Sequence, residues 1–428
     1  MTLSEFQEKY PSKWERIAVA KDLSDEQLDE IINSADTVQG KNFYSRLKKK
    51  NQIIRYSSKY NLLTNKITKY FLSSADNNLV YSPFSVLMLL SIMADSVNGN
   101  TRQEILDAIG TDMSYEDYRE MISEIQHLFT EEITDDHDHW EWSHGGSVVS
   151  SNAVCVKESI GSSITEGYED RLAKYQGKLF SSKNMIEDVN TWVKEKTKGM
   201  ITNVAENSMK DMLVCFLNAI SFEVSWSEPY EDEDILEGNF TNSDGSVSKV
   251  QMQCSIENAY FENEYIMAFS KVYADWDFSY IAILPKQSGF EYLKECAIQL
   301  DFSEILKDMD HENYSANIKM PEFKYDFEND ITNLCKKMGI STLFSQQADF
   351  SPMTSERLEV GGIFHKAHIE LDRNVTKAAA VSVGVAAGCA PKEIRDVNIT
   401  FDRPFIYAIM HNETKLPVFV GIVNEIRE

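Results

Sequence analysis

Long apolar runs, a basic charge balance and closely spaced cysteines are all lacking in this chain of 428 residues. Its longest apolar stretches, 84–93 and 212–222, are too short to cross a bilayer as a helix. The formal charge is −26, and the acidic residues are spread along the chain rather than gathered in a tail. We therefore expect no membrane-spanning helix, and repulsion of both nucleic acid and anionic lipid.

The six cysteines show none of the short paired spacings that mark zinc sites or a disulfide framework. We expect most of them to be reduced thiols, the first two of them buried: Cys155, Cys215, Cys254, Cys296, Cys335 and Cys389. The N-terminal residues also lack the basic start and the apolar run of a secretory signal. These patterns predict a cytoplasmic protein and leave open an extracellular one, exported by a route that needs no signal.

Two regions of the chain differ in composition. Residues 1–57 are rich in charged side chains with apolar residues at helical spacing, which predicts a small helical extension of unknown role. In the domain predicted over 58–428, helices come first and strands dominate later. Helices are expected over 78–92 after an initial turn, 101–109, 114–129 and 186–198, and strands over 212–226, 247–254, 280–284, 316–323 and 362–371. The order predicts a mixed α+β fold with large antiparallel sheets and flanking helices.

A run of acids and histidines over 135–144 raises the question of a metal site. His137, His139 and His144 are suitable ligand types, as are the neighbouring carboxylates. No second cluster with recognisable spacing accompanies them, so we interpret the run as a solvated loop. We expect neither a metal nor another cofactor.

The segment 373–389, RNVTKAAAVSVGVAAGC, carries the most functional information in the chain. In an extended conformation its side chains alternate between two faces. One face holds only small residues, namely Thr376, Ala378, Ala380, Ser382, Gly384 and Ala386. The other face is rich in valine, which favours strand pairing. The composition also fits a helix or an ordinary buried strand, but its place between predicted strands favours a loop that can become a strand.

Motifs from residue 58 to the end resemble, in order, those of the serpin family. They are NLVYSPFS (78–85), NTWVKEKTKGMI (190–201), LNAISFEVSW (217–226), Leu284 with Pro285, Pro321 with Phe323, ADFS (348–351), His365 with Lys366, Pro404 with Phe405, and 419–421. This resemblance implies one domain of three β-sheets with eight or nine flanking helices. It also implies an exposed reactive-centre loop within 373–398.

The resemblance implies a suicide-substrate inhibitor of proteases rather than an enzyme. A protease attacks the loop, and the freed N-terminal limb inserts as a new central strand of the largest sheet, carrying the acylated protease with it. The expected partner is therefore a target serine protease in a covalent acyl complex, and the inhibitor is expected to be a monomer. A non-inhibitory serpin acting as a binding, storage or chaperone-like protein is the alternative.

The family's usual spacing from the hinge places the reactive bond at Cys389–Ala390. The hinge positions implied by the resemblance are Arg373, Val375, Thr376, Ala378, Ala379, Ala380 and Ser382. From Thr376 to Ala386 no charged residue or proline faces inward, where either would block insertion. Val375 stands where the family usually has Gly, and Lys377 where it often has Glu.

Two further groups are implied by the resemblance. The shutter cluster, a polar group under the centre of the main sheet, corresponds to Ser82, Ser85, Asn218 and His365. The breach, where the loop enters the sheet, corresponds to Trp226 and Glu322. Arg373 and Glu322 would form an ion pair with the charges swapped relative to most inhibitory relatives, and two unrelated surface charges remain the alternative.

The residues around the expected reactive bond are small. Ala386 to Cys389 on one side and Ala390 on the other suit a shallow primary pocket, which favours an elastase-like or subtilisin-like serine protease. Two alternatives for Cys389 stay open: a redox-sensitive thiol, or a contact with a cysteine protease.

Overall fold

The computed structural model describes residues 1–73, 77–110, 113–130, 148–196, 199, 212–222, 224–274, 276–358, 360–371 and 394–427. These residues form two compact units, Met1–Tyr60 and Asn61–Glu428. Helix α4 (Val38–Ser73) belongs to both, because the boundary at Tyr60 falls within it. The helix that begins in the predicted extension therefore continues into the main unit.

The first unit is helical. It contains α1 (Leu3–Lys9), α2 (Lys13–Ala20), α3 (Asp25–Asn33) and the start of α4. Reciprocal side-chain to backbone hydrogen bonds define the first turns of α1 and α3, where Thr2 pairs with Glu5 and Ser24 with Gln27. The unit has its own small apolar core, made of Phe6, Ala20, Leu28, Ile31, Tyr44 and Leu47.

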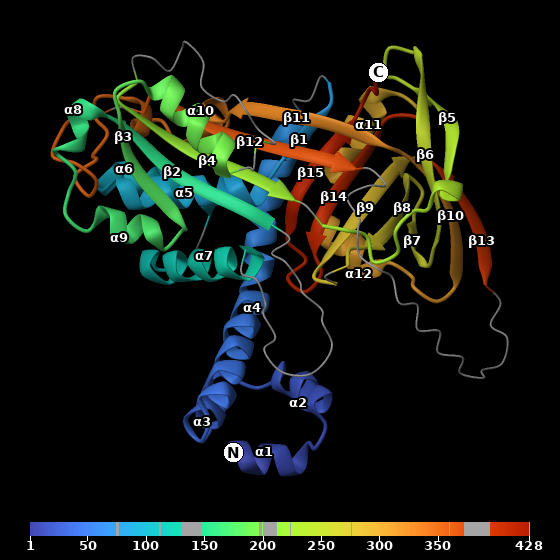
Figure 1. Ribbon diagram of the computed structural model, residues 1–428, viewed down its shortest axis with the longest axis horizontal. Helices are drawn as coiled ribbons and strands as arrows, with labels where there is room; N and C mark the ends of the chain where they lie inside the picture. The colour runs from blue at the N-terminus through green and yellow to red at the C-terminus, as the bar shows by residue number, and fades with distance from the viewer. Residues whose placement is uncertain are drawn as a thin grey trace. The chain divides into compact units, whose positions relative to one another are not determined.

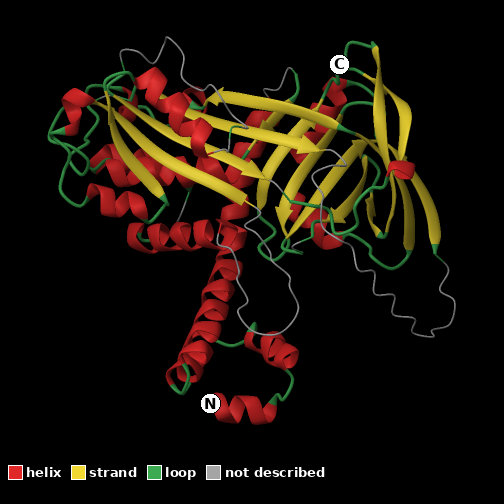
Figure 2. Cartoon of the chain, viewed as in Figure 1, coloured by secondary structure: helices red, strands yellow, loops and turns green. Residues whose placement is uncertain are grey.

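The second unit contains three sheets within the part of the chain that the structure describes (Figures 1 and 2). The five-stranded sheet, called the central sheet below, has the order β11-β12-β4-β2-β3. The six-stranded sheet has the order β1-β15-β14-β9-β8-β7, and the four-stranded sheet the order β13-β10-β6-β5. Together with the surrounding helices, this arrangement confirms the predicted α+β fold.

The strands have the following bounds: β1 (Leu79–Tyr81), β2 (Val148–Lys157), β3 (Gly177–Ser182), β4 (Val214–Phe222), β5 (Ile235–Thr241), β6 (Val247–Glu257), β7 (Ala259–Glu262), β8 (Ile266–Val272), β9 (Phe278–Pro285), β10 (Tyr314–Pro321), β11 (Phe323–Asp330), β12 (Gly362–Leu371), β13 (Arg395–Thr400), β14 (Phe405–His411) and β15 (Pro417–Val423).

Nine complete helices lie in the described ranges of this unit, in agreement with the eight or nine expected. They are α5 (Pro83–Ser96), α6 (Gly99–Ile109), α7 (Tyr115–Thr130), α8 (Glu158–Gly161), α9 (Tyr168–Ala173), α10 (Met185–Lys196), α11 (Phe290–Gln299), α12 (Phe302–Asp308) and α13 (Thr332–Lys337). None of the helices in the described ranges has the length and apolarity that crossing a membrane requires.

Helix α5 forms the centre of the core. Ser82 caps its start by accepting a hydrogen bond from the Ser85 N–H, and Pro83 occupies the first helical position, where a missing N–H costs nothing. Every residue of α5 is buried. The helix packs against β4 of the central sheet and against β15 of the six-stranded sheet, so it joins two layers.

Two of the predicted strands differ from those observed. The run 316–323 is divided at Glu322, since β10 ends at Pro321 in one sheet and β11 begins at Phe323 in another. The run 212–226 ends as a strand at Phe222, and Trp226 forms only an isolated bridge with Tyr273. In both cases the local apolar pattern continues although the chain changes its pairing partner, which a periodicity argument does not detect.

Candidate functional site

The seam of the central sheet lies between β4 and β12. These strands are direct neighbours and run parallel, with register partners from Gly362 opposite Cys215 to His368 opposite Ser221. Leu371, at the end of β12, is the last described residue before the segment that holds the predicted hinge and reactive bond. The chain is described again from Ile394, and β13 then joins the four-stranded sheet.

His365 connects the seam to helix α5. It lies on β12 and is fully buried, and its Nε2 accepts a hydrogen bond of 3.0 Å from the backbone N–H of Ser82. Ser82 in turn accepts from the Ser85 N–H at 3.0 Å. The structure thus brings Ser82, Ser85 and His365 together beneath the sheet, where the sequence analysis placed its shutter cluster.

Asn218 lies beside His365 in the next strand, since the two are register partners across the seam. Its Nδ2 donates to Oδ1 of Asn152 at 2.9 Å and to Oγ of Ser150 at 3.3 Å. Asn152 donates to the carbonyl of Tyr175 at 2.8 Å. A buried polar row therefore crosses β12, β4 and β2. The sequence analysis missed Asn152 and Ser150, since it predicted no strand over 148–157.

The protonation state of His365 follows from its surroundings. Burial lowers the pKa of its imidazole to about 3. The ring is therefore neutral at physiological pH, and because Nε2 accepts the Ser82 N–H, the proton is on Nδ1. A neutral ring is required here, since an imidazolium could not accept this hydrogen bond.

Trp226 lies beyond the end of β4 in a group of aromatic rings. Its indole stacks on Tyr273 with ring centroids 4.5 Å apart and an interplanar angle of 7°. Tyr230 and Tyr280 meet it edge-on at 6.3 and 5.8 Å. Such offset and edge contacts between buried rings stabilise the packing beyond the area that they bury.

A buried ion pair, missed by the sequence analysis, borders these rings. Lys271 of β8 donates to a carboxylate oxygen of Glu257 in β6 at 2.8 Å, with side chains only 5% and 12% exposed. The ammonium also lies 4.9 Å from the ring centroid of Tyr230 and 5.9 Å from that of Trp226. The pair joins the six-stranded to the four-stranded sheet next to the end of β4. A lysine within a strand carries no local signal of burial.

Glu322 occupies the single position between β10 and β11. Its backbone N–H donates to the carbonyl of Gln251 at 2.9 Å, and its neighbour Phe323 is the register partner of Leu371. The expected partner Arg373 lies outside the described residues, so their ion pair stays a prediction. The same holds for the other hinge positions and for the reactive bond: Val375, Thr376, Ala378, Ala379, Ala380, Ser382, Cys389 and Ala390.

The run 135–144 with its three histidines also lies outside the described residues. Within the described ranges, no three His, Cys, Asp or Glu side chains gather as a metal site would require. The arrangement that remains is a polar row across a parallel seam, bordered at one end by aromatic rings and a buried ion pair. The hydroxyl, amide and imidazole groups of this row act as hydrogen-bonding groups in the interior of the central sheet.

Most of the chain is similar to the proteins of a known family. Residues 59–426 match the family model described as Serpin (serine protease inhibitor). Serpin B10 of Sorex araneus is 29% identical over 59% of this chain and 67% of its own length. Iripin-1 of Ixodes ricinus is 26% identical over 83% of this chain and 90% of its own.

Solved structures agree on the fold. The thermophilic serpin Tengpin in its native state has a TM-score of 0.72 and 28% identity, covering 86% of this chain and 94% of its own. A thyroxine-binding globulin complex with thyroxine has a TM-score of 0.71 at 19% identity, covering 87% of this chain and all of its own. The second likeness shows the fold alone.

We predict that His365 makes stability fall in mild acid. The unfolded histidine binds a proton below about pH 6.5, whereas the folded one does so only near pH 3, so protonation favours the unfolded chain between these values. Relative to His365→Gln, which keeps an acceptor, the wild type should lose about 1.4 kcal/mol of unfolding free energy per pH unit below about pH 6.5. Denaturant titrations from about pH 7.5 to about pH 5 measure this difference. His311→Gln, at an exposed position, is the control, and parallel profiles for the wild type and His365→Gln would contradict the assignment.

We also predict that the buried pair of Lys271 and Glu257 is strongly coupled. Glu257→Gln leaves a buried ammonium without its counter-charge and should cost about 3–5 kcal/mol of unfolding free energy. Lys271→Met added to it should restore most of the loss, because no buried charge then remains. The half-exposed pair of Lys286 and Glu262 at 3.1 Å is the matched control, where Glu262→Gln should cost about 1 kcal/mol or less. Equal costs for the two single substitutions would show that the buried pair is solvated.

Proposed function

The chain belongs to the serpin family, whose members are mostly protease inhibitors, and from this premise we propose that it inhibits a serine protease. After cleavage at Cys389–Ala390, the N-terminal limb 373–389 inserts into the central sheet between β4 and β12. The protease stays attached to Cys389 as an acyl enzyme and is carried along with the inserting limb. The inhibitor acts as a monomer and is consumed in the reaction.

The observation that carries this proposal is the direction of the two strands at the seam. Since β4 and β12 are parallel, a strand placed between them and running the opposite way is antiparallel to both. A segment that follows β12 and folds back onto it has this direction. Residues 373–389 also outnumber the nine residues of β4 and the ten of β12, so the limb is long enough to run along both.

The side chains of the limb fit the interior they would enter. The inward row from Thr376 to Ala386 is small and uncharged. Below the seam, His365 and Asn218 have partners on α5 and on β2, away from the seam itself. These hydrogen bonds can therefore persist while the two strands separate. Nδ1 of His365 and Oδ1 of Asn218, which have no hydrogen-bond partner among the described residues, lose none in that step.

The residues at the reactive bond support a target with a shallow primary pocket. Cys389 preceded by Gly388 and Ala387 suits an elastase-like or subtilisin-like serine protease, since pockets built for arginine, phenylalanine or aspartate lose most of their binding energy on such side chains. A cysteine protease is the second candidate target, since a contact of Cys389 with such an enzyme stays open.

We predict a complex with elastase that survives boiling in detergent, visible as a band of the summed mass on a denaturing gel. Thr376→Arg should lower the inhibition rate by at least about 100-fold, because insertion would bury an unpaired charge. Lys377→Glu is the matched control, because the alternation of side chains would place this residue on the outer face of an inserted strand, where we expect a charge to be tolerated. Clean cleavage of the wild type by every protease of a panel, without a stable complex, would instead support a non-inhibitory binding protein.

Cleavage should also stabilise the fold. A limb inserted between β4 and β12 gains ladder hydrogen bonds on both edges and buries its inward row, so we predict that the melting temperature rises by at least about 10 °C. A protease that cuts within 386–391 without being trapped is suitable for this experiment. Calorimetry before and after the cut measures the change. In Thr376→Arg the rise should be largely lost, and an unchanged melting curve for the cleaved wild type would contradict insertion.

A further inference from the structure

Two of the free thiols lie directly opposite each other in the central sheet. Cys155 of β2 and Cys215 of β4 are register partners in an antiparallel pair that runs from Val148 to Val156. Both are fully buried and both are free thiols. The other described cysteines, Cys254, Cys296 and Cys335, lie on β6, α11 and α13.

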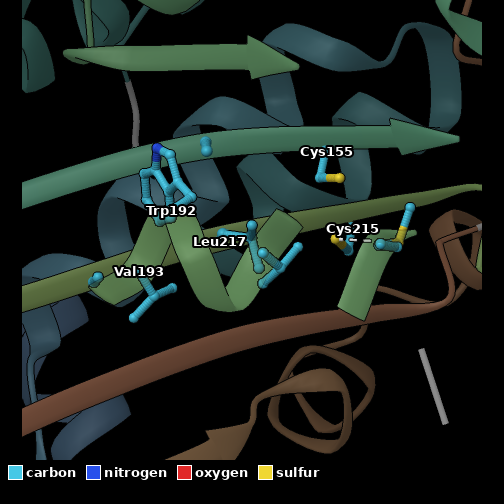
Figure 3. Close-up of a cluster of buried hydrophobic side chains, with 9 residues drawn as sticks. Cys155, Trp192, Val193, Cys215 and Leu217 are labelled. Atoms are coloured by element: carbon cyan, nitrogen blue, oxygen red, sulfur yellow. Dashed lines mark hydrogen bonds between the residues drawn. The ribbon is translucent and has the colours of Figure 1, made fainter. Parts of the chain in front are cut away.

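Both thiols face the same side of the sheet. Ala153 and Cys155 on β2, and Cys215 and Leu217 on β4, belong to one apolar cluster together with Met185 and Trp192 of α10. Since side chains alternate along a strand, cross-strand partners that both contact one helix must share a face. Figure 3 shows Cys155 and Cys215 on neighbouring strands within this cluster.

The backbone spacing suits a disulfide. The Lys157 N–H donates to the carbonyl of Leu213 at 2.9 Å, which makes that pair hydrogen-bonded. Hydrogen-bonded pairs recur every second residue, so Cys155 and Cys215 form one too, with Cα atoms about 5.5 Å apart. Disulfides most often join Cα atoms about 5.5–6 Å apart. In a hydrogen-bonded pair the Cβ atoms lie about 5.5 Å apart, so they must approach by about 1.7 Å to reach the mean Cβ spacing of a disulfide, which requires a local shift of the two strands.

We propose that Cys155 and Cys215 are a redox modification site, at which a peroxide oxidises the two thiols to a disulfide that thiol reductants reverse. One thiolate attacks the peroxide, gives a sulfenic acid and releases one water. The second thiol then displaces the hydroxyl group as a second water, and the S–S bond forms. In total two thiols and one hydrogen peroxide yield one disulfide and two waters, so the two sulfurs are oxidised and the peroxide is reduced.

The surroundings make this reaction slow rather than impossible. The hydrogen bond with Cys155 and burial raise the pKa of the Cys215 thiol, which keeps it protonated at neutral pH. The Cys215 thiol also donates to Sδ of Met185, at the start of α10, with the two sulfur atoms 3.8 Å apart. The oxidant must therefore pass beneath α10, and the rate should rise with pH and with any loosening of that helix.

The bridge would act on one part of the central sheet. It would fasten β2 to β4 and close a covalent loop that contains α8, α9, β3 and α10. The seam between β4 and β12 would stay unbridged, because the disulfide would join β4 to β2 and not to β12. The proposal therefore does not depend on protease inhibition, and the two can fail separately.

The test treats the full-length native protein with hydrogen peroxide at mildly alkaline pH, then unfolds it in an alkylating agent and maps its peptides by mass spectrometry. The expected result is a peptide pair that contains Cys155 and Cys215, lighter by two hydrogens and separated by dithiothreitol. The melting temperature should rise in the bridged sample and return after reduction. Cys254, which is partly exposed, reports that the oxidant was active.

Matched variants define the site. Cys155→Ala and Cys215→Ala should each abolish the bridged pair, whereas Cys296→Ala, at a buried cysteine on α11, should leave it unchanged. Since the decisive measurement is made on the wild type, a poorly folded variant does not affect it. Oxidation of Cys254 while Cys155 and Cys215 are both recovered as alkylated thiols would overturn the proposal. So would their recovery as separate sulfinic acids.

Discussion

The parallel pairing of β4 with β12 is the constraint on which the central sheet depends. It places a histidine and an asparagine side by side in the interior, and each must find its partners away from the other strand. His365 finds the Ser82 backbone at the cap of α5, and Asn218 finds Asn152 on β2. The cap of a core helix therefore binds the β12 side of the polar row, and β2 binds the β4 side. The hydrogen bonds of the two side chains therefore lie on opposite sides of the seam, while Nδ1 of His365 and Oδ1 of Asn218 have no hydrogen-bond partner among the described residues.

Strand β4 is therefore held to its two neighbours, β2 and β12, by different interactions. On the β2 side, the antiparallel ladder from Val148 to Val156 and the apolar packing of α10 hold the strands together. At the seam, backbone ladder hydrogen bonds join β4 and β12, whereas the side chains of His365 and Asn218 bond to Ser82 and Asn152 instead of to each other. The aromatic group around Trp226 and the pair of Lys271 with Glu257 lie near one end, where three sheets meet. Buried charges there penalise any arrangement that separates them.

The sequence alone predicts the fold class and the main elements, and it indicates Ser82, Ser85, Asn218 and His365 through their place in motifs. It does not predict Asn152, because Ser and Asn residues in 150–152 weaken the strand pattern, and their partners come from a strand more than sixty residues later. From the sequence, Lys271 is expected to be solvated, because its partner Glu257 lies on a strand of another sheet. The burial of Cys155 and Cys215 was expected, and it is confirmed. Their register was not predictable, because a shift of one residue in pairing leaves local composition unchanged.

The connection between β10 and β11 has a mechanical consequence for the segment that leaves the central sheet. Leu371 is anchored opposite Phe323, and Arg395 is anchored opposite Tyr314, while only Glu322 separates the two anchoring strands. From Tyr314 to Phe323 the backbone extends by at most about 30 Å, so both attachment points are tethered to one nearly inextensible stretch of chain. An uncut connection is therefore held at its far end by the pairing of Arg395, and this attachment limits how far a strand could insert along the seam. In the proposed mechanism, cleavage releases the N-terminal limb from the anchor at Arg395, so that the limb can insert along the whole seam.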